Sequence, residues 1–279
     1  MYSIALSMDG KKAICGSGDG EVRLWDIDSG KVITKWSGHK KTVRSLCWNR
    51  DGGRVVSGSW DGTARVWNVK SGETILTIKT GLTDVLAVLY SPDETMIATG
   101  GDNDEKEFLD IWNSKTGKRV KNLKGHIHEV NCLAWTTDGG TLISGSWDES
   151  ILTWNTITWQ QVLVLKGHTS SVDGIAISPN GRILASGASW DKTARLWNLE
   201  NGQHIGSPLQ HAKPVNSVSF SADGKLLATG CDDNNAYTWD VSEIIRDAGC
   251  NQLLFNTNVS LPVAFLISLS TTKRAIAGL

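Results

Sequence analysis

Ser57-Gly-Ser-Trp-Asp-Gly-Thr-Ala-Arg-Val-Trp67 and Ser144-Gly-Ser-Trp-Asp-Glu-Ser-Ile-Leu-Thr-Trp154 are two copies of one sequence pattern. The last tryptophan of the pattern recurs at spacings of 42, 45, 42, 43 and 42 residues, as Trp25, Trp67, Trp112, Trp154, Trp197 and Trp239. A period near 40 residues is typical of chains built from repeated supersecondary units. We therefore expect one array of six similar units and not two unrelated domains.

The repeat over residues 37–79 shows how one unit folds. Apolar and polar residues alternate in Val43–Trp48 and Thr63–Trp67, and Arg54–Ser57 and Thr74–Ile78 are two further short strand segments. The segments between them contain the Asp, Asn, Ser and Gly residues that turns favour. A single four-stranded sheet cannot bury both of its faces, whereas sheets stacked around an axis can. The predicted fold class is all-β: a propeller of six four-stranded blades.

Three repeats open with a Gly-His pair, and all six close with Trp-Asp or Trp-Asn. On these residues the chain resembles the WD40 repeat family. The resemblance covers residues 1 to about 241, and it implies a propeller over residues 1–249. Its repeats are expected over residues 1–36, 37–79, 80–123, 124–166, 167–209 and 210–249. Because seven blades are the commoner arrangement in this family, an incomplete seven-bladed propeller is the alternative.

Four repeats also place a His, a Ser or Thr, an Asp and a Trp at matching offsets. These sets are His39, Ser57, Asp61 and Trp67; His126, Ser144, Asp148 and Trp154; His168, Ser186, Asp191 and Trp197; and His211, Thr229, Asp233 and Trp239. Ser, His and Asp form the triad of many hydrolases, but an active site needs one such set and this chain has four. The resemblance implies a structural network that links the Gly-His loop to the second and third strands. We expect no catalytic residue and no enzyme activity.

Two repeats depart from this pattern. The first has no upstream His and has Cys15 where Ser is expected, and the third has Leu82 in place of His. The acidic connection over residues 100–107 is longer in the third repeat, and it lacks the spacing of an EF-hand loop. We expect these two blades to be the less rigid ones, and we expect no metal site.

The C-terminal part of the chain differs from the repeats. Residues 242–249 predict a short capped helix that stops at Gly249. The tail over residues 250–279 does not resemble a repeat. The fourth strand of the sixth blade would come from residues 251–256, from residues 259–268, or be absent, so the tail is a possible source of a closing strand.

The composition excludes several classes of partner. The 28 basic and 29 acidic residues give no basic footprint for nucleic acid or an anionic membrane. Residues 1–9 lack the segments of a signal peptide, and the longest apolar stretch, residues 259–269, is too short to span a membrane. The five cysteines show no Cys-x-x-Cys spacing. We expect a monomeric protein of the cytoplasm or nucleus, not secreted, without cofactors.

Trp60, Trp147 and Trp190 directly precede the structural Asp of their repeats. That turn lies on the face that carries the Gly-His loops, which we call the top face, and the resemblance implies that this position lines the channel mouth. The polar and charged residues expected on the same face are Arg44, Glu129, Asn131, Asp173, Asn216 and Asp232. Aromatic rings beside carboxylates suit a cation such as a basic side chain. Trp36, on a fourth strand, is expected to be partly exposed.

These observations predict a non-catalytic scaffold that binds a protein or peptide on its top face, with a basic side chain at the channel mouth. One alternative is a substrate receptor of a ubiquitin ligase. Such receptors often carry Trp-Asp-x-Arg, whereas the first repeat has Trp25-Asp-Ile-Asp28. Another alternative is the recognition domain of a signalling system.

Overall fold

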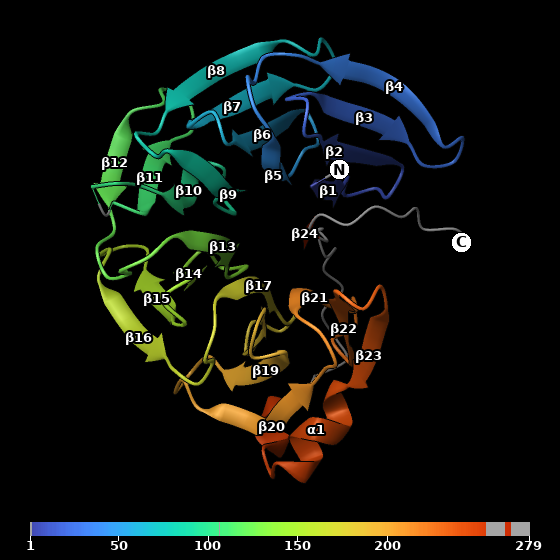
Figure 1. Cartoon of the computed structure of the whole chain (residues 1–279), viewed down its shortest axis with the longest axis vertical. Helices are drawn as coiled ribbons and strands as arrows, with labels where there is room; N and C mark the ends of the chain where they lie inside the picture. The colour runs from blue at the N-terminus through green and yellow to red at the C-terminus, as the bar shows by residue number, and fades with distance from the viewer. Residues whose placement is uncertain (1, 106, 255–265, 269–279) are drawn as a thin grey trace.

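A computed structural model describes residues 2–105, 107–254 and 266–268. Six small antiparallel sheets surround a central axis, and the chain passes round the ring once, from one blade to the next (Figure 1). The predicted all-β fold and the six-bladed propeller are therefore confirmed.

The strands of a blade are consecutive in the sequence and the first of them is innermost, except that the first blade has one further strand from the C-terminal tail beside its first strand. The first three blades contain β1 (Ser3–Leu6), β2 (Lys12–Gly16), β3 (Val22–Asp26), β4 (Lys31–Trp36), β5 (Val43–Trp48), β6 (Arg54–Ser59), β7 (Thr63–Asn68), β8 (Thr74–Lys79), β9 (Asp84–Tyr90), β10 (Met96–Asp102), β11 (Leu109–Asn113) and β12 (Arg119–Asn122). The other three contain β13 (Val130–Trp135), β14 (Thr141–Ser146), β15 (Ile151–Asn155), β16 (Gln161–Leu165), β17 (Val172–Ile177), β18 (Ile183–Ala188), β19 (Thr193–Asn198), β20 (His204–Gln210), β21 (Val215–Phe220), β22 (Leu226–Cys231) and β23 (Ala236–Asp240). In the second blade every strand begins at the predicted residue, and none ends more than two residues from its predicted end.

The core lies between neighbouring blades. Gly58 on β6 lies so close to the next blade that an added Cβ would be 2.6 Å from Val85 Cγ1. Only glycine allows this approach, and this explains why all six repeats have glycine at this point, after Ser or Thr in five of them and after Cys15 in the first. The same arrangement recurs from blade to blade until the sixth, where the counterpart Gly230 meets Ser217 of its own blade.

Trp36 is part of this core, so the prediction that it would be partly exposed is wrong. Its ring stacks on that of Trp67, with the ring centroids 5.8 Å apart and the planes inclined by 25°. The two side chains come from the first and second blades and belong to one buried cluster. The prediction failed because the neighbouring blade, and not the alternation within β4, decides whether this position is covered.

The sixth blade has three strands in the part of the chain that the structure describes, so the expected fourth strand is missing from this sheet. Helix α1 (Val241–Asp247) follows β23 directly and packs against β20 and β22. The Asp240 side chain caps its first turn by accepting a hydrogen bond from the Glu243 amide at 2.9 Å, and Gly249 follows with φ 68°. The predicted short helix with a glycine stop is therefore confirmed.

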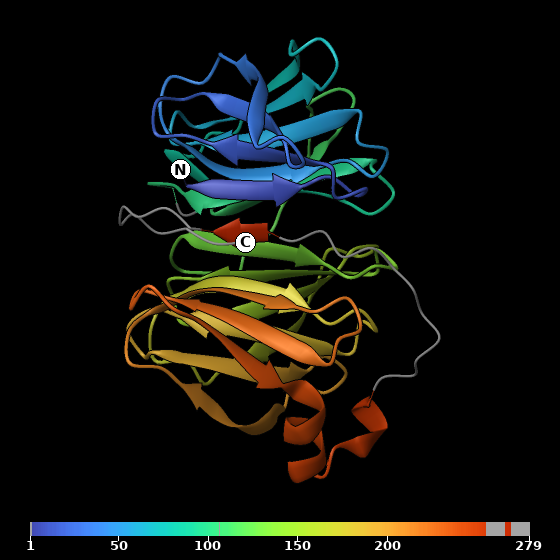
Figure 2. The same ribbon diagram turned by 90° about the vertical axis from the view of Figure 1, so that its right-hand side faces the viewer.

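Two further elements lie in the tail. Residues Asn251–Leu253 form the 3₁₀ helix η1, and Leu266–Ser268 form the short strand β24. β24 pairs with β1 in antiparallel register, with Ser3 opposite Ser268, and lies near β21. Figures 1 and 2 both place β24 between the first and sixth blades, at the junction where the ring closes. It is therefore added to the first blade and not to the sixth; the rest of residues 255–279 lies outside the described residues.

Candidate functional site

The His, Ser, Asp and Trp of the second blade form one connected network. His39 Nδ1 lies 3.0 Å from Asp61 Oδ2, and His39 Nε2 lies 2.7 Å from Ser57 Oγ. An ionised carboxylate can only accept, so Nδ1 carries the proton and Nε2 accepts from the Ser57 hydroxyl. Trp67 Nε1 donates to the same oxygen at 2.7 Å. The Ser57 hydroxyl therefore both donates and accepts.

The fourth and fifth blades repeat this geometry. The His-to-Asp and His-to-Ser distances are both 2.8 Å for His126 and both 2.6 Å for His168. Trp154 and Trp197 donate to Ser144 and Ser186 at 2.9 and 2.8 Å. In all three networks the Asp also accepts from the amide that follows the His, as Asp61 does from Lys40 at 2.9 Å. The carboxylate therefore joins the Gly-His loop to the turn between the second and third strands.

The serines of these networks have the partners of a catalytic triad but not its accessibility. Ser57, Ser144 and Ser186 are each 0% exposed. A nucleophile must reach a carbonyl carbon, and here the hydroxyl is enclosed and shares a hydrogen bond with an indole. The geometry supports a structural role, as the four-fold multiplicity predicts.

Burial and hydrogen bonding act in opposite directions on the charges of the network. Burial is the largest influence on the pKa of Asp61 and raises it, but hydrogen bonds from Thr63 and the Lys40 amide, together with His39, hold the pKa below its usual value. Burial lowers the pKa of His39, against the nearby Asp61 charge. Asp61 is therefore ionised and His39 neutral near neutral pH.

The sixth blade has only part of the predicted network. His211 Nε2 and Trp239 Nε1 both bond Thr229 Oγ1, at 2.8 and 3.1 Å, as in the other blades. His211 Nδ1, however, donates to the Leu209 carbonyl at 3.0 Å, and Asp233 accepts from the Tyr237 hydroxyl. The prediction that Asp233 would bond His211 is therefore wrong, because Tyr237, four residues along the same hairpin, takes up its carboxylate.

The two repeats that lack the His retain the tryptophan with different partners. In the third blade Trp112 Nε1 donates to Thr99 at 2.8 Å, while Leu82 is buried among apolar side chains. In the first blade Cys15 replaces the serine, and Trp25 Nε1 is buried without a hydrogen-bond partner among the described residues. The position of the tryptophan therefore does not depend on the complete hydrogen-bond network, because the indole occupies the same place in the first blade without a polar partner among the described residues.

The second, fourth and fifth blades, which have complete networks, are the blades whose turns carry the predicted surface tryptophans. Trp147 and Trp190 are 53% and 79% exposed, each directly before a network Asp. Trp147 N donates to the Glu129 carbonyl at 3.0 Å, and Trp190 N donates to Ser170 Oγ at 3.1 Å. These hydrogen bonds of the backbone amides fix the conformation of the two turns, so the exposed rings are attached to an ordered backbone.

Trp60 has a different environment from the other two. Its ring centroid lies 5.8 Å from that of Tyr2, it is half-buried, and its Nε1 is enclosed without a partner among the described residues. Trp60 and Trp147 line the mouth of the channel together with Arg44, Leu86, Asn131, Asp173 and Asn216. Trp190 is absent from this lining and lies at a more exposed position.

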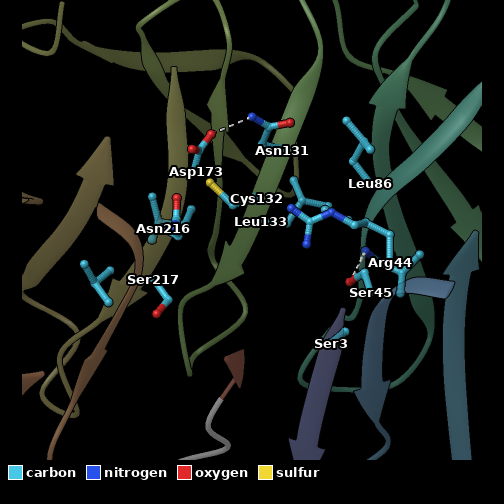
Figure 3. Close-up of a pocket in the computed structure, with 15 residues that line it drawn as sticks. Ser3, Arg44, Ser45, Leu86, Asn131, Cys132, Leu133, Asp173, Asn216 and Ser217 are labelled. Carbon is cyan, nitrogen blue, oxygen red and sulfur yellow. Dashed lines mark hydrogen bonds between the residues drawn. The ribbon is translucent and has the colours of Figure 1, made fainter. Parts of the chain in front are cut away.

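Opposite charges occupy the channel mouth. Arg44 extends from β5 toward the centre of the ring, while Asp173 on β17 accepts from Asn131 Nδ2 at 3.0 Å (Figure 3). Ser189 also donates to Asp173. Burial raises the pKa of the Asp173 carboxyl to about 6, against hydrogen bonds from Ser171 and Asn131 and the charge of Arg44. The carboxylate oxygens of Asp173 thus already accept hydrogen bonds from residues of the same chain.

The remaining predicted residues lie around this centre. Asn216 donates to Asp232, whose own amide donates to the Pro214 carbonyl. Glu129 Oε2 lies 3.6 Å from His128 Nδ1, and the Glu129 carbonyl supports the Trp147 turn. Ile127, next to the network residue His126, is 69% exposed on the loop that Asp148 holds. The sequence reasoning did not select Ile127, although an apolar residue directly after Gly-His was a signal that could have found it.

The described ranges contain neither a candidate metal site nor a candidate membrane-spanning helix. No group of three or more His, Cys, Asp or Glu side chains there is arranged to hold a metal ion. No helix in those ranges has the length and apolarity to cross a membrane.

A comparison with known protein families matches five stretches of the chain, which overlap the repeats described above. A family model described as "WD domain, G-beta repeat" matches residues 1–26, 30–68, 117–155, 159–198 and 202–240. The unmatched stretch between residues 68 and 117 holds most of the third repeat, in which Leu82 replaces the histidine.

Curated relatives match about half of the chain. Autophagy-related protein 16 of Arabidopsis thaliana is 25% identical over 51% of the chain and 28% of its own length. Periodic tryptophan protein 2 of Saccharomyces cerevisiae is 35% identical over 53% and 16%. THO complex subunit 3 of Arabidopsis thaliana is 28% identical over 50% and 44%. In each case the match spans less than half the length of the relative.

Proposed function

The chain belongs to the WD40 repeat family, and from that premise we propose that it is a scaffold that binds a protein or peptide on its top face. Members of this family generally present their propellers to protein partners and are generally not enzymes. The proposed partner carries a basic side chain and is neither a nucleic acid nor a membrane. Because one relative is THO complex subunit 3 of Arabidopsis thaliana and another is U3 small nucleolar RNA-associated protein 15 of Schizosaccharomyces pombe, we propose the nucleus or cytoplasm as its location.

The observation that carries this proposal is the exposure of Trp147 and Trp190 on turns that buried networks hold in place. An exposed indole loses solvent contact favourably on binding, and a fixed turn loses little conformational freedom. Tryptophan is among the side chains that contribute most to protein interfaces. Trp147 and Trp190 lie on matching turns of successive blades and are the proposed contact residues.

The chemistry of these two rings favours a cationic side chain. A guanidinium or ammonium group is attracted to the face of an indole. Glu129, whose carbonyl accepts from the Trp147 amide, supplies a carboxylate beside this turn. We assign Asp173 a smaller part, because Asn131 and Ser189 already donate to it and Arg44 lies in the same channel.

A binding experiment with matched variants tests this proposal. Replacing both Trp147 and Trp190 by alanine should weaken retention of co-purifying partners by at least about tenfold, as expected for hot-spot residues. Ile157→Ala is the control, because Ile157 is even more exposed but lies in the turn before the outer strand β16. Partners retained equally by the double variant and the wild-type protein would contradict the proposal. Far-UV circular dichroism should show that both variants are folded.

A further inference from the structure

The outer strands of the blades are sheet edges, and an edge offers unpaired backbone groups to another strand. β4, β8, β12, β16 and β20 are the last strands of complete blades. Proteins usually protect such edges with charged residues, proline or covering elements. The five edges of this ring can therefore be compared with one another, since they share the same position in the same architecture.

Three of these edges carry a recognisable protection, and the fourth, β8, has fewer exposed aliphatic residues than β16. β4 contains Lys31 and Lys35, and β12 contains Arg119 and Lys121. β8 has one exposed aliphatic residue, Ile75, beside the exposed Thr77, and its last residue, Lys79, has a counterpart in Lys166 directly after β16. β20 contains a glycine and a proline, and α1 packs against it. Each of the three protections either repels a second strand or occupies the place where it would pair.

β16, the edge of the fourth blade, has none of these features. Its sequence is Gln161-Val-Leu-Val-Leu165, without a charge, a glycine or a proline. Val162 and Val164 are 58% and 43% exposed. β-branched residues favour strand pairing, and short uncharged runs of high β-propensity are the segments that pair with other chains.

The backbone of β16 also has N–H and C=O groups directed toward the free edge, where a second strand could bond them. The Leu163 amide donates inward, to Thr153 Oγ1 at 3.0 Å. Backbone groups alternate between the two sides of an antiparallel strand, so those of Val162 and Val164 are directed toward the free edge. A second strand that pairs with this edge would therefore bond at the two exposed valines.

We propose that β16 pairs with β16 of a second copy of this chain, in antiparallel register about a two-fold axis at Leu163. The Val-Leu-Val sequence is symmetric about Leu163, so Val162 of each copy lies opposite Val164 of the other. Cross-strand pairs of β-branched residues stabilise antiparallel sheets. The two fourth blades then form one continuous eight-stranded sheet.

Electrostatics favours a second copy at this edge over self-pairing at β4 or β12. The same two-fold operation about Ile33 would place Lys31 opposite Lys35, and about Val120 it would place Arg119 opposite Lys121. At β16 no like charges meet. The formal net charge of the chain, −1, adds little long-range repulsion between copies.

The test measures the mass of the intact protein by light scattering or sedimentation over about 1–100 µM, since a single strand pair is a small interface. The wild-type protein should change from monomer to dimer in this range. Val162→Lys combined with Val164→Lys sets lysine opposite lysine and should raise the dissociation constant at least about tenfold. Ile75→Lys, on the comparable strand β8, should leave it unchanged.

A charge-reversal variant tests the register. Val162→Glu combined with Val164→Lys places opposite charges across the two-fold axis and should restore dimerisation, more strongly at low salt. A wild-type protein that is monomeric throughout this range would overturn the proposal. So would double-lysine variants that dimerise as the wild-type protein does. Because β16 is separate from the top-face turns, retention of partners by the double-lysine variant distinguishes this interface from the proposed binding function.

Discussion

The fourth and first blades contain the same tryptophan at the same point of the sheet, yet they differ in what surrounds its indole nitrogen. In the fourth blade Trp154 donates to Ser144, which is bonded to His126 and, through it, to Asp148. In the first blade Cys15 stands in the place of the serine, and Trp25 Nε1 has no partner among the described residues. Both blades form complete sheets. Blade formation therefore follows from strand patterning and apolar packing, and the polar network has another consequence.

That consequence is the position of the surface turn. The network Asp joins the turn between the second and third strands to the Gly-His loop in the second, fourth and fifth blades. In those blades the residue before the Asp is tryptophan, whereas in the first it is Gly18. The blades that fix the turn are the ones that display an aromatic ring on it. The comparison thus links buried hydrogen bonds to the proposed binding surface.

The largest expected effect comes from removing the centre of a complete network. His126→Ala should lower the free energy of unfolding by about 1–3 kcal/mol, because Ser144 and Asp148 lose a buried partner. His211→Ala should cost less than about 1 kcal/mol, because His211 is only half-buried and is not bonded to Asp233. Urea unfolding followed by circular dichroism measures both. Equal losses in the two variants would remove the distinction between complete and partial networks.

An intermediate effect is expected from pH in the third blade. Burial raises the pKa of Asp110 from 3.8 to about 6, although Asn122 and Arg119 act against it. The folded state therefore binds a proton more readily than the unfolded chain, and the contribution of Asp110 to stability falls as pH rises from about 4 to about 6. Asp61, whose pKa is lowered in the second blade, has the opposite effect: its contribution is lost as pH falls.

Asp110→Asn keeps an oxygen for Asn122 and removes the buried charge. It should raise the free energy of unfolding by about 1–2 kcal/mol at neutral pH and have little effect near pH 4. Urea titrations at the two pH values provide the measurement. A gain of the same size at both values would mean that the charge of Asp110 is not the cause.

The smallest effect is expected from supplying the missing acceptor in the first blade. Cys15→Ser places a hydroxyl oxygen near Trp25 Nε1 and should increase stability by about 0.5–1 kcal/mol. Ser57→Cys in the second blade is the reciprocal change and should destabilise by more, since it interrupts a network with three other members. If Cys15→Ser is destabilising, the missing hydrogen-bond acceptor at Trp25 Nε1 is not the difference in stability between the two blades.

The sequence predicts the strands well because each depends on local alternation and turn chemistry within one repeat. Trp36 was misjudged because the next blade covers it, and Asp233 because Tyr237 competes for its carboxylate. Neither fact can be read from the repeat pattern. The pairing of β24 with β1 likewise joins residues more than 250 positions apart. At the channel mouth, the sequence selected Arg44 and Asp173 but not Ser189, which occupies part of the Asp173 carboxylate.

The stacked pair Trp36 and Trp67 gives the boundary between the first two blades its own optical signature. Two indole chromophores with ring centroids 5.8 Å apart interact through their electronic transition dipoles. Such an exciton interaction produces paired bands of opposite sign in circular dichroism, and these bands disappear when the rings separate. Because both rings are fully enclosed, their contribution would be lost when these two blades part, whereas Trp135 and Trp159, with ring centroids 6.4 Å apart, form a second pair within the fourth blade.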